Sequence, residues 1–123
     1  MTTLSLERPL SQSEFDLFAR ISGDNNPIHV DAEFSSRTRF GRTVSHGMLL
    51  YTILWGLVQK QYPGAKQLSQ DLMFPNPAYA DEPLRFEIAE TAASGNERTL
   101  STRASRMADG AVVLDGRTTI TLS

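Results

Sequence analysis

The chain has 123 residues, of which 40% are hydrophobic and 21% are charged. These values are typical of one globular domain, so they exclude a multidomain assembly and a disordered tail, and we expect a single domain over residues 1–123. Twelve Lys and Arg against 14 Asp and Glu give a net charge of −2, which argues against a nucleic-acid partner. The absence of cysteine excludes disulfides, thiolate nucleophiles and zinc–thiolate sites.

Targeting and membrane segments are not evident in the sequence. The first ten residues carry an acid and a proline, where a signal peptide needs a basic start and an unbroken apolar stretch. The longest apolar-rich run, Met48–Val58, is too short to cross a bilayer. We therefore expect a soluble cytoplasmic protein without a membrane partner.

Helix signals dominate the first half of the chain, after a short alternating strand at Thr3–Leu6. Ser11 and Glu14 have the spacing of a capping box, and Ser22-Gly23 is typical of a helix end. These signals predict a helix between Ser11 and Gly23. A polar, proline-containing loop follows at 24–29, and then a short helical turn over 31–37 that Asp31 caps.

A second helix is expected from Ser45 or His46 to Tyr62-Pro63-Gly64, with Ser45 as a plausible cap. Its apolar residues point in nearly every direction around the helix axis. A helix that is apolar on all sides must be buried on all sides, so we expect this helix to lie at the centre of the domain.

The second half of the chain reads as strands separated by turns. Alternation predicts strands at 68–74, 84–88, 98–107 and 111–122, with Asp109-Gly110 as a tight turn. About five strands and one apolar helix bury each other if a curved antiparallel sheet wraps around the helix, so the expected fold class is α+β. Such a sheet has an unpaired edge, and pairing with a second copy predicts at least a homodimer.

The loop at 24–29 carries the chemistry that the sequence suggests. Asp24 and His29 lie on either side of Pro27, which fixes its own backbone and restricts Asn26. A carboxylate and an imidazole on one stiff loop can hold a water molecule and move protons near neutral pH. The same residues also suit an Asx-turn with no catalytic role, so the spacing alone leaves both interpretations open.

Gly47 lies where the second helix begins. Amides at a helix N-terminus are unpaired and partially positive, and a glycine lets a substrate carbonyl approach such an N–H group. A donor aimed at charge that develops in the transition state contributes roughly 3–4 kcal/mol. Close packing of the helix against a strand is the alternative role for Gly47, and His46 suits a positioning role better than a catalytic one.

The run Ile21-Ser22-Gly23-Asp24-Asn25-Asn26-Pro27-Ile28-His29-Val30-Asp31, with Phe40-Gly41 and His46-Gly47-Met48-Leu49, closely resembles the MaoC-like (R)-specific enoyl-CoA hydratases. The resemblance is strongest over residues 15–58, and it implies a hot-dog fold, in which the sheet wraps the long helix. It also implies reversible hydration of a trans-2-enoyl-CoA to the (3R)-hydroxyacyl-CoA. By motif position, Asp24 and His29 would be the catalytic pair and the Gly47 amide would hold the thioester oxygen.

Substrate contacts are expected from residues around this motif: Asn26, Pro27, His46, Met48 and Arg42. Arg42 belongs to a basic cluster with Arg37 and Arg39, which suits CoA phosphates but also suits a solvated loop. Trp55 is bulkier than expected of this family at its position. It either faces the acyl pocket, where it would limit chain length, or belongs to the core.

Two other functions are alternatives for this sequence: a hot-dog acyl-CoA thioesterase and a non-catalytic acyl-CoA-binding module. The Asp24 and His29 combination argues against both of them. Two histidines without cysteine or an acidic cluster predict no metal site. The resemblance implies no cofactor besides the CoA of the substrate.

Overall fold

The computed structural model describes residues 3–123. After one N-terminal strand, the helices come first along the chain and the remaining strands follow. In chain order the elements are β1 (Thr3–Arg8), α1 (Gln12–Ser22), α2 (Pro27–Val30), α3 (Ala32–Ser36), α4 (Gly47–Gln61), β2 (Lys66–Met73), β3 (Leu84–Ser94), β4 (Glu97–Arg106) and β5 (Val112–Thr121).

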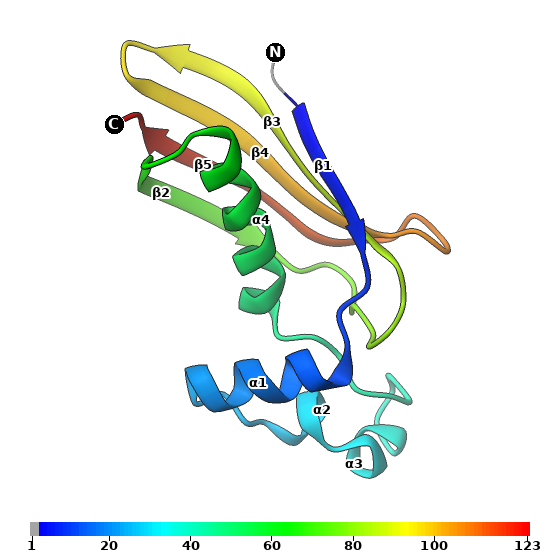
Figure 1. Ribbon diagram of the computed structural model, residues 1–123. Coiled ribbons are helices and arrows are strands. Elements are labelled where there is room, and N and C mark those ends of the chain that lie inside the picture. Colours follow the sequence, from blue (N-terminus) through cyan, green and yellow to red (C-terminus); the bar gives the residue numbers. More distant parts are fainter. Residues whose placement is uncertain (1–2) are drawn as a thin grey trace.

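The sheet has five antiparallel strands in the order β1-β3-β4-β5-β2, and it curves around α4 (Figure 1). Helices α1, α2 and α3 lie together beyond the N-terminal end of α4, away from most of the sheet (Figure 1). This arrangement confirms the expected α+β hot-dog architecture. Strands β1 and β2 form the two edges, so each leaves one row of backbone groups without a strand partner within the described chain.

The capping signals in the first half fold as expected. Ser11 is the N-cap of α1, and it forms a capping box with Glu14. Gly23 ends α1 in the left-handed conformation, with φ of 82°. The loop expected at 24–29 is wrong in one respect, because its second half is the short helix α2: the Asn26 side chain accepts the amide of Ile28, and Pro27 is pre-organised for the first turn.

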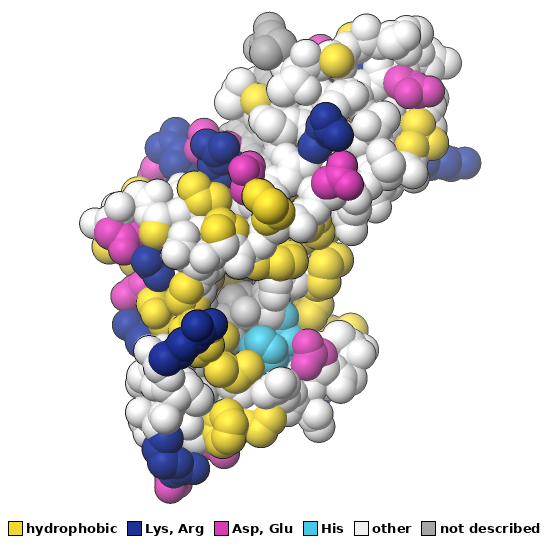
Figure 2. Space-filling view, turned by 180° about the vertical axis from the view of Figure 1, so that it is seen from behind, with side chains coloured by type: hydrophobic (Ala, Val, Ile, Leu, Met, Phe, Trp, Pro, Cys, Tyr) yellow, Lys and Arg dark blue, Asp and Glu magenta, His cyan; other side chains and the backbone are white. Residues whose placement is uncertain are grey.

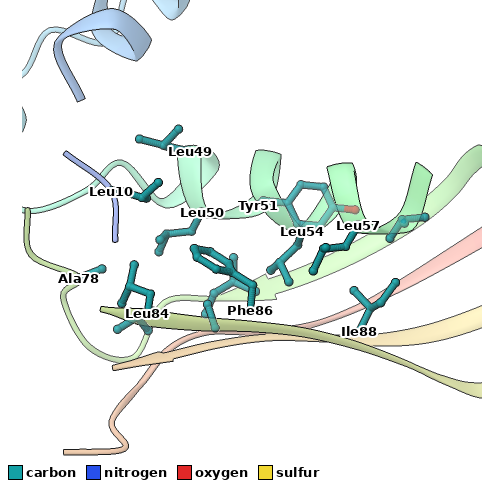
Figure 3. Packing of buried hydrophobic residues seen from close by; sticks show 14 of the residues in the cluster. Leu10, Leu49, Leu50, Tyr51, Leu54, Leu57, Ala78, Leu84, Phe86 and Ile88 are labelled. Carbon is teal, nitrogen blue, oxygen red and sulfur yellow. The ribbon is translucent and has the colours of Figure 1, made fainter. Parts of the chain in front are cut away.

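The core lies between α4 and the concave face of the sheet. Leu50 and Leu54 of α4 are turned toward Leu84 and Phe86 of β3 (Figure 3), and all four side chains are buried. Burial of one such side chain contributes about 1.5–3 kcal/mol, so this layer fixes α4 against the sheet. It therefore also fixes the position of the N-terminus of α4.

Helix α4 differs from the expectation in two ways. Thr52, Gly56 and Met48 are exposed, so one face of the helix is open in the single chain, and burial on all sides is wrong for the chain alone. Ser45 does not cap the helix: the N-cap is His46, and the Ser45 hydroxyl donates to the His46 carbonyl. Within residues 3–123, neither α4 nor any other helix has the length and hydrophobicity needed to cross a membrane.

Candidate active site

The turn after α1 presents the carboxylate of Asp24. The Asp24 amide donates to the hydroxyl of Ser22, and Asn26 begins α2 two residues later. The Asp24 side chain is 56% exposed, so its carboxylate reaches solvent. Helices α1 and α2 therefore hold this short segment at both ends. One carboxylate oxygen of Asp24 accepts the Asn26 amide at 3.5 Å, as in an Asx-turn, and the other faces His29 and can contact a ligand.

His29 lies on α2 with one ring nitrogen already bonded. Its Nδ1 is 2.8 Å from the backbone oxygen of Val44. Because a carbonyl oxygen only accepts, Nδ1 carries the proton, and Nε2 of the neutral ring keeps its lone pair. That Nε2 lies 3.9 Å from a carboxylate oxygen of Asp24, too far for a direct hydrogen bond.

His46 lies beneath this pair. It is 2% exposed, and its Nε2–H donates to the backbone oxygen of Asp24 at 2.8 Å. Its ring stacks on the His29 ring with centroids 3.8 Å apart. Burial lowers the pKa of His46, opposed by the bond to Asp24, so burial favours the neutral ring. His46 thus contacts both candidate catalytic residues.

The N-terminus of α4 begins at Gly47, and no side chain caps it. Its first amides are therefore the unpaired, partially positive donors of a helix start. The Phe74 ring packs directly on Gly47: a Cβ built there would lie 2.7 Å from two ring carbons. Gly47 therefore has the close-packing role, and this role is compatible with binding of a substrate oxygen by the Gly47 amide.

A cavity of about 480 Å³ brings these groups together, and Asp24, His46 and Gly47 all line it. His29 is not one of its lining residues, but its Nε2 lies 3.9 Å from the Asp24 carboxylate and its ring stacks on that of His46, and both of these residues line the cavity. Figure 2 shows a hollow in which histidine and acidic side chains lie next to hydrophobic ones, with basic side chains nearby. The remaining walls are mainly apolar, and they include Phe18, Phe40, Leu50, Phe74, Pro75 and Val113.

The other expected substrate contacts divide into two groups. Met48 lines the cavity and is 46% exposed. Asn26 and Pro27 do not line it and instead build the start of α2. Arg42 is also outside the cavity wall: its guanidinium binds Glu82 and the Ala80 carbonyl and lies over the Tyr79 ring.

Trp55 is partly buried against the hydrophobic core and does not line the cavity in the single chain, so the core interpretation fits this position better. Sequence reasoning missed Phe74 and Val44. Phe74 is the last residue of the expected strand at 68–74 and precedes Pro75, a break that marks a strand end but not a cavity wall. Val44 acts through its backbone oxygen, for which its side chain gives no signal.

The donor atoms of Asp24, His29 and His46 lie within 4.8 Å of one another, close enough to consider a metal site. The stacked rings do not suit one. A metal bound by an imidazole lies in the ring plane at about 2.0–2.1 Å from the nitrogen. The ring planes of His29 and His46 are inclined by only 25° and the rings stack at 3.8 Å, so the two planes intersect much farther than this from either nitrogen. One metal ion therefore cannot lie in both ring planes at bonding distance.

Comparison with known proteins places the chain in a family. Residues 2–111 match the model of the MaoC-like domain. The chain belongs to the MaoC-like domain family. The chain is 35% identical over 102 residues to the (R)-specific enoyl-CoA hydratase of Aeromonas caviae, covering 80% of this chain and 76% of that protein. It is 32% identical over 115 residues to the 3-hydroxybutyryl-CoA dehydratase of Methylorubrum extorquens, covering 90% of this chain and 72% of that protein.

Solved structures agree with the sequence comparison. The (R)-hydratase of A. caviae involved in PHA biosynthesis superposes with a TM-score of 0.94 at 31% identity. The match covers 99% of this chain and 95% of that one. The expected MaoC-like family and hot-dog fold are therefore confirmed.

Proposed function

We propose that this MaoC-like protein is an (R)-specific enoyl-CoA hydratase, a hydro-lyase that converts a trans-2-enoyl-CoA to the (3R)-hydroxyacyl-CoA and back. The observation that carries the proposal is the 3.9 Å separation of His29 Nε2 and the Asp24 carboxylate, beside an uncapped helix N-terminus. The similarity to an (R)-specific enoyl-CoA hydratase over 80% of the chain supports it.

The separation of Asp24 and His29 suits a shared water molecule. A water oxygen at about 2.8 Å from both acceptors bridges them. Because the carboxylate and the neutral Nε2 both accept, the water donates one hydrogen bond to each and turns an oxygen lone pair toward the substrate. The oxygen then bonds to the β-carbon, one of the pair takes a proton, and a proton is delivered to the α-carbon.

The negative charge that forms during this addition belongs on the thioester oxygen. The Gly47 amide is the donor in the best place to hold it, because it is uncapped and lines the same cavity as Asp24. Hydrogen bonding to that oxygen also withdraws electrons from the β-carbon before the water attacks. The reaction moves no electrons between substrates and therefore needs no redox cofactor.

His46 and Met48 are the proposed substrate-side residues of the cavity wall, since both line it. Asn26 and Pro27 act indirectly by holding Asp24 and His29 at fixed positions on either side of them. Arg42 has its charge satisfied by Glu82, so we assign it to the support of the loop and not to the substrate. A CoA thioester substrate agrees with the cytoplasmic location expected from the sequence.

A homodimer is part of the same proposal. The open face of α4 includes Met48, and β2 exposes Leu68 and Met73 by 53% and 62% along a free sheet edge. Apolar groups on an unpaired edge strand favour pairing with a second copy by an isologous contact. We propose that the two β2 edges meet about a twofold axis.

One assay separates this function from the two alternatives. The purified protein is mixed with crotonyl-CoA, and the ultraviolet absorbance of the enoyl thioester and the release of free thiol are followed together. Loss of enoyl absorbance without thiol, with a (3R) product on a chiral column, supports the hydratase. Thiol release would identify a thioesterase, and binding without either change would identify a binding module; both results contradict the proposal.

A further inference from the structure

We propose that Arg39 binds a phosphate of the carrier group to which the acyl chain is attached. This inference rests on the proposed function, since it needs a phosphate-bearing thioester as substrate. Among the described residues that line the cavity, Asp24 and Arg39 are the only two with formally charged side chains. The cavity therefore has one acidic group in its catalytic part and one basic group elsewhere on its wall.

The neighbouring arginines are already neutralised by acidic side chains. Arg37 pairs with Glu33 at 3.2 Å, and Arg42 pairs with Glu82 at 3.1 Å. Arg39 differs, because no carboxylate of residues 3–123 forms an ion pair with it, and its side chain is exposed. Of the basic cluster seen in the sequence, it is the member whose charge is available to a ligand.

The backbone and an aromatic ring hold Arg39 in place. The Gly41 amide donates to the Thr38 carbonyl at 3.1 Å, which closes a turn with Arg39 at its second position. The Thr38 hydroxyl also accepts the Phe40 amide. The guanidinium lies over the Phe40 ring, 4.8 Å from its centroid, and Phe40 lines the same cavity.

The position and surroundings of the Arg39 guanidinium suit a phosphate group of the substrate. Arginine presents paired N–H donors that match phosphate oxygens, and a guanidinium on an aromatic face loses little freedom when it binds. The chain carries a net charge of −2, so a polyanionic substrate needs a local cation to approach it. CoA and the phosphopantetheine of a carrier protein both carry such a phosphate.

The test compares Arg39→Gln with the parent on three crotonyl thioesters: CoA, 4′-phosphopantetheine and pantetheine without phosphate. We expect KM for crotonyl-CoA to rise about five- to tenfold with kcat nearly unchanged, and the pantetheine thioester to be unaffected. Arg37→Gln is the matched control, since Arg37 is a nearby exposed arginine outside the cavity wall. Arg39→Lys should keep part of the effect.

The outcomes are distinct. A rise in KM for both phosphate-bearing thioesters supports binding of the phosphate next to pantetheine, and a rise for CoA alone supports binding of the nucleotide phosphates. An equal change on all three thioesters, or no change on any, overturns the proposal. If the parent protein hydrates none of them, the proposed function itself fails, which is a different result.

Discussion

The imidazole rings of His29 and His46 stack with their centroids 3.8 Å apart and their planes inclined by 25°. One ring, that of His29, has its free Nε2 beside Asp24, and the other is buried beneath it. Two protonated rings at this distance would repel each other, so the stack is favourable only while at least one of the two rings is neutral. Burial, which lowers the pKa of His46, provides this condition.

A pH dependence of stability follows from that lowered pKa. The unfolded chain takes up a proton at His46 near pH 6.5, its ordinary value, and the folded chain does so only at lower pH. The unfolded state thus binds more protons below that value, so the contribution of His46 is complete above about pH 6.5 and is lost as the pH falls.

We expect the free energy of unfolding in urea to fall between about pH 7.5 and about pH 5.5, and to fall less in His46→Gln, which keeps a donor for the Asp24 carbonyl. Glu14 and Asp109, whose pKa values are also lowered, lose their contributions only at more acidic pH. Equal slopes in the parent and the variant would show that His46 is not the group responsible.

Removal of either member of the catalytic pair should abolish hydration without unfolding the protein. Asp24→Asn replaces the carboxylate with a neutral amide that cannot take a proton, and His29→Ala removes the imidazole, so we expect kcat for crotonyl-CoA to drop by about 10²–10⁴ in each variant. Circular dichroism and the elution volume on gel filtration should remain those of the parent. Full activity in both variants would disprove the assignment of this pair.

Gly47→Ala tests the two roles of this glycine. The added methyl group collides with the Phe74 ring, and because that ring is half-exposed and can shift, we expect a loss of about 1 kcal/mol in unfolding free energy. In the double variant Gly47→Ala/Phe74→Ala the collision is removed, so its unfolding free energy should be higher than that of Gly47→Ala. Its kcat should still be at least about tenfold lower than that of Phe74→Ala, because the methyl group blocks the Gly47 amide. If activity returned together with stability, Gly47 would serve packing alone.

The proposed dimer depends on the edge strand β2. A charge placed there, as in Leu68→Glu or Met73→Glu, should leave the fold intact and convert the dimer to a monomer in sedimentation velocity. Leu6→Glu on β1, the opposite edge strand, is the matched control and should remain dimeric. Dissociation by the β1 variant, with dimers retained by both β2 variants, would place the interface at the other edge.

The amino-acid sequence alone predicts the elements whose signals are local. The Ser11 capping box, the left-handed Gly23 and the alternation of Leu84, Phe86 and Ile88 each act within a few residues, so they remain readable without the fold. The same holds for the motif from Asp24 to His29, because α1 and α2 fix its two ends locally. Fold class and the position of this loop on the chain were therefore within reach of sequence reasoning.

The contacts between distant segments were decided only by the tertiary structure. The bond from His29 to Val44, the packing of Phe74 on Gly47 and the pairing of Arg42 with Glu82 join residues 15, 27 and 40 positions apart. Each contact depends on how segments distant in the sequence pack together, and no local propensity encodes it. For the same reason, the sequence alone did not distinguish the paired Arg42 from the unpaired Arg39: both are arginines on a polar loop, and only the folded chain shows which one has a carboxylate beside it.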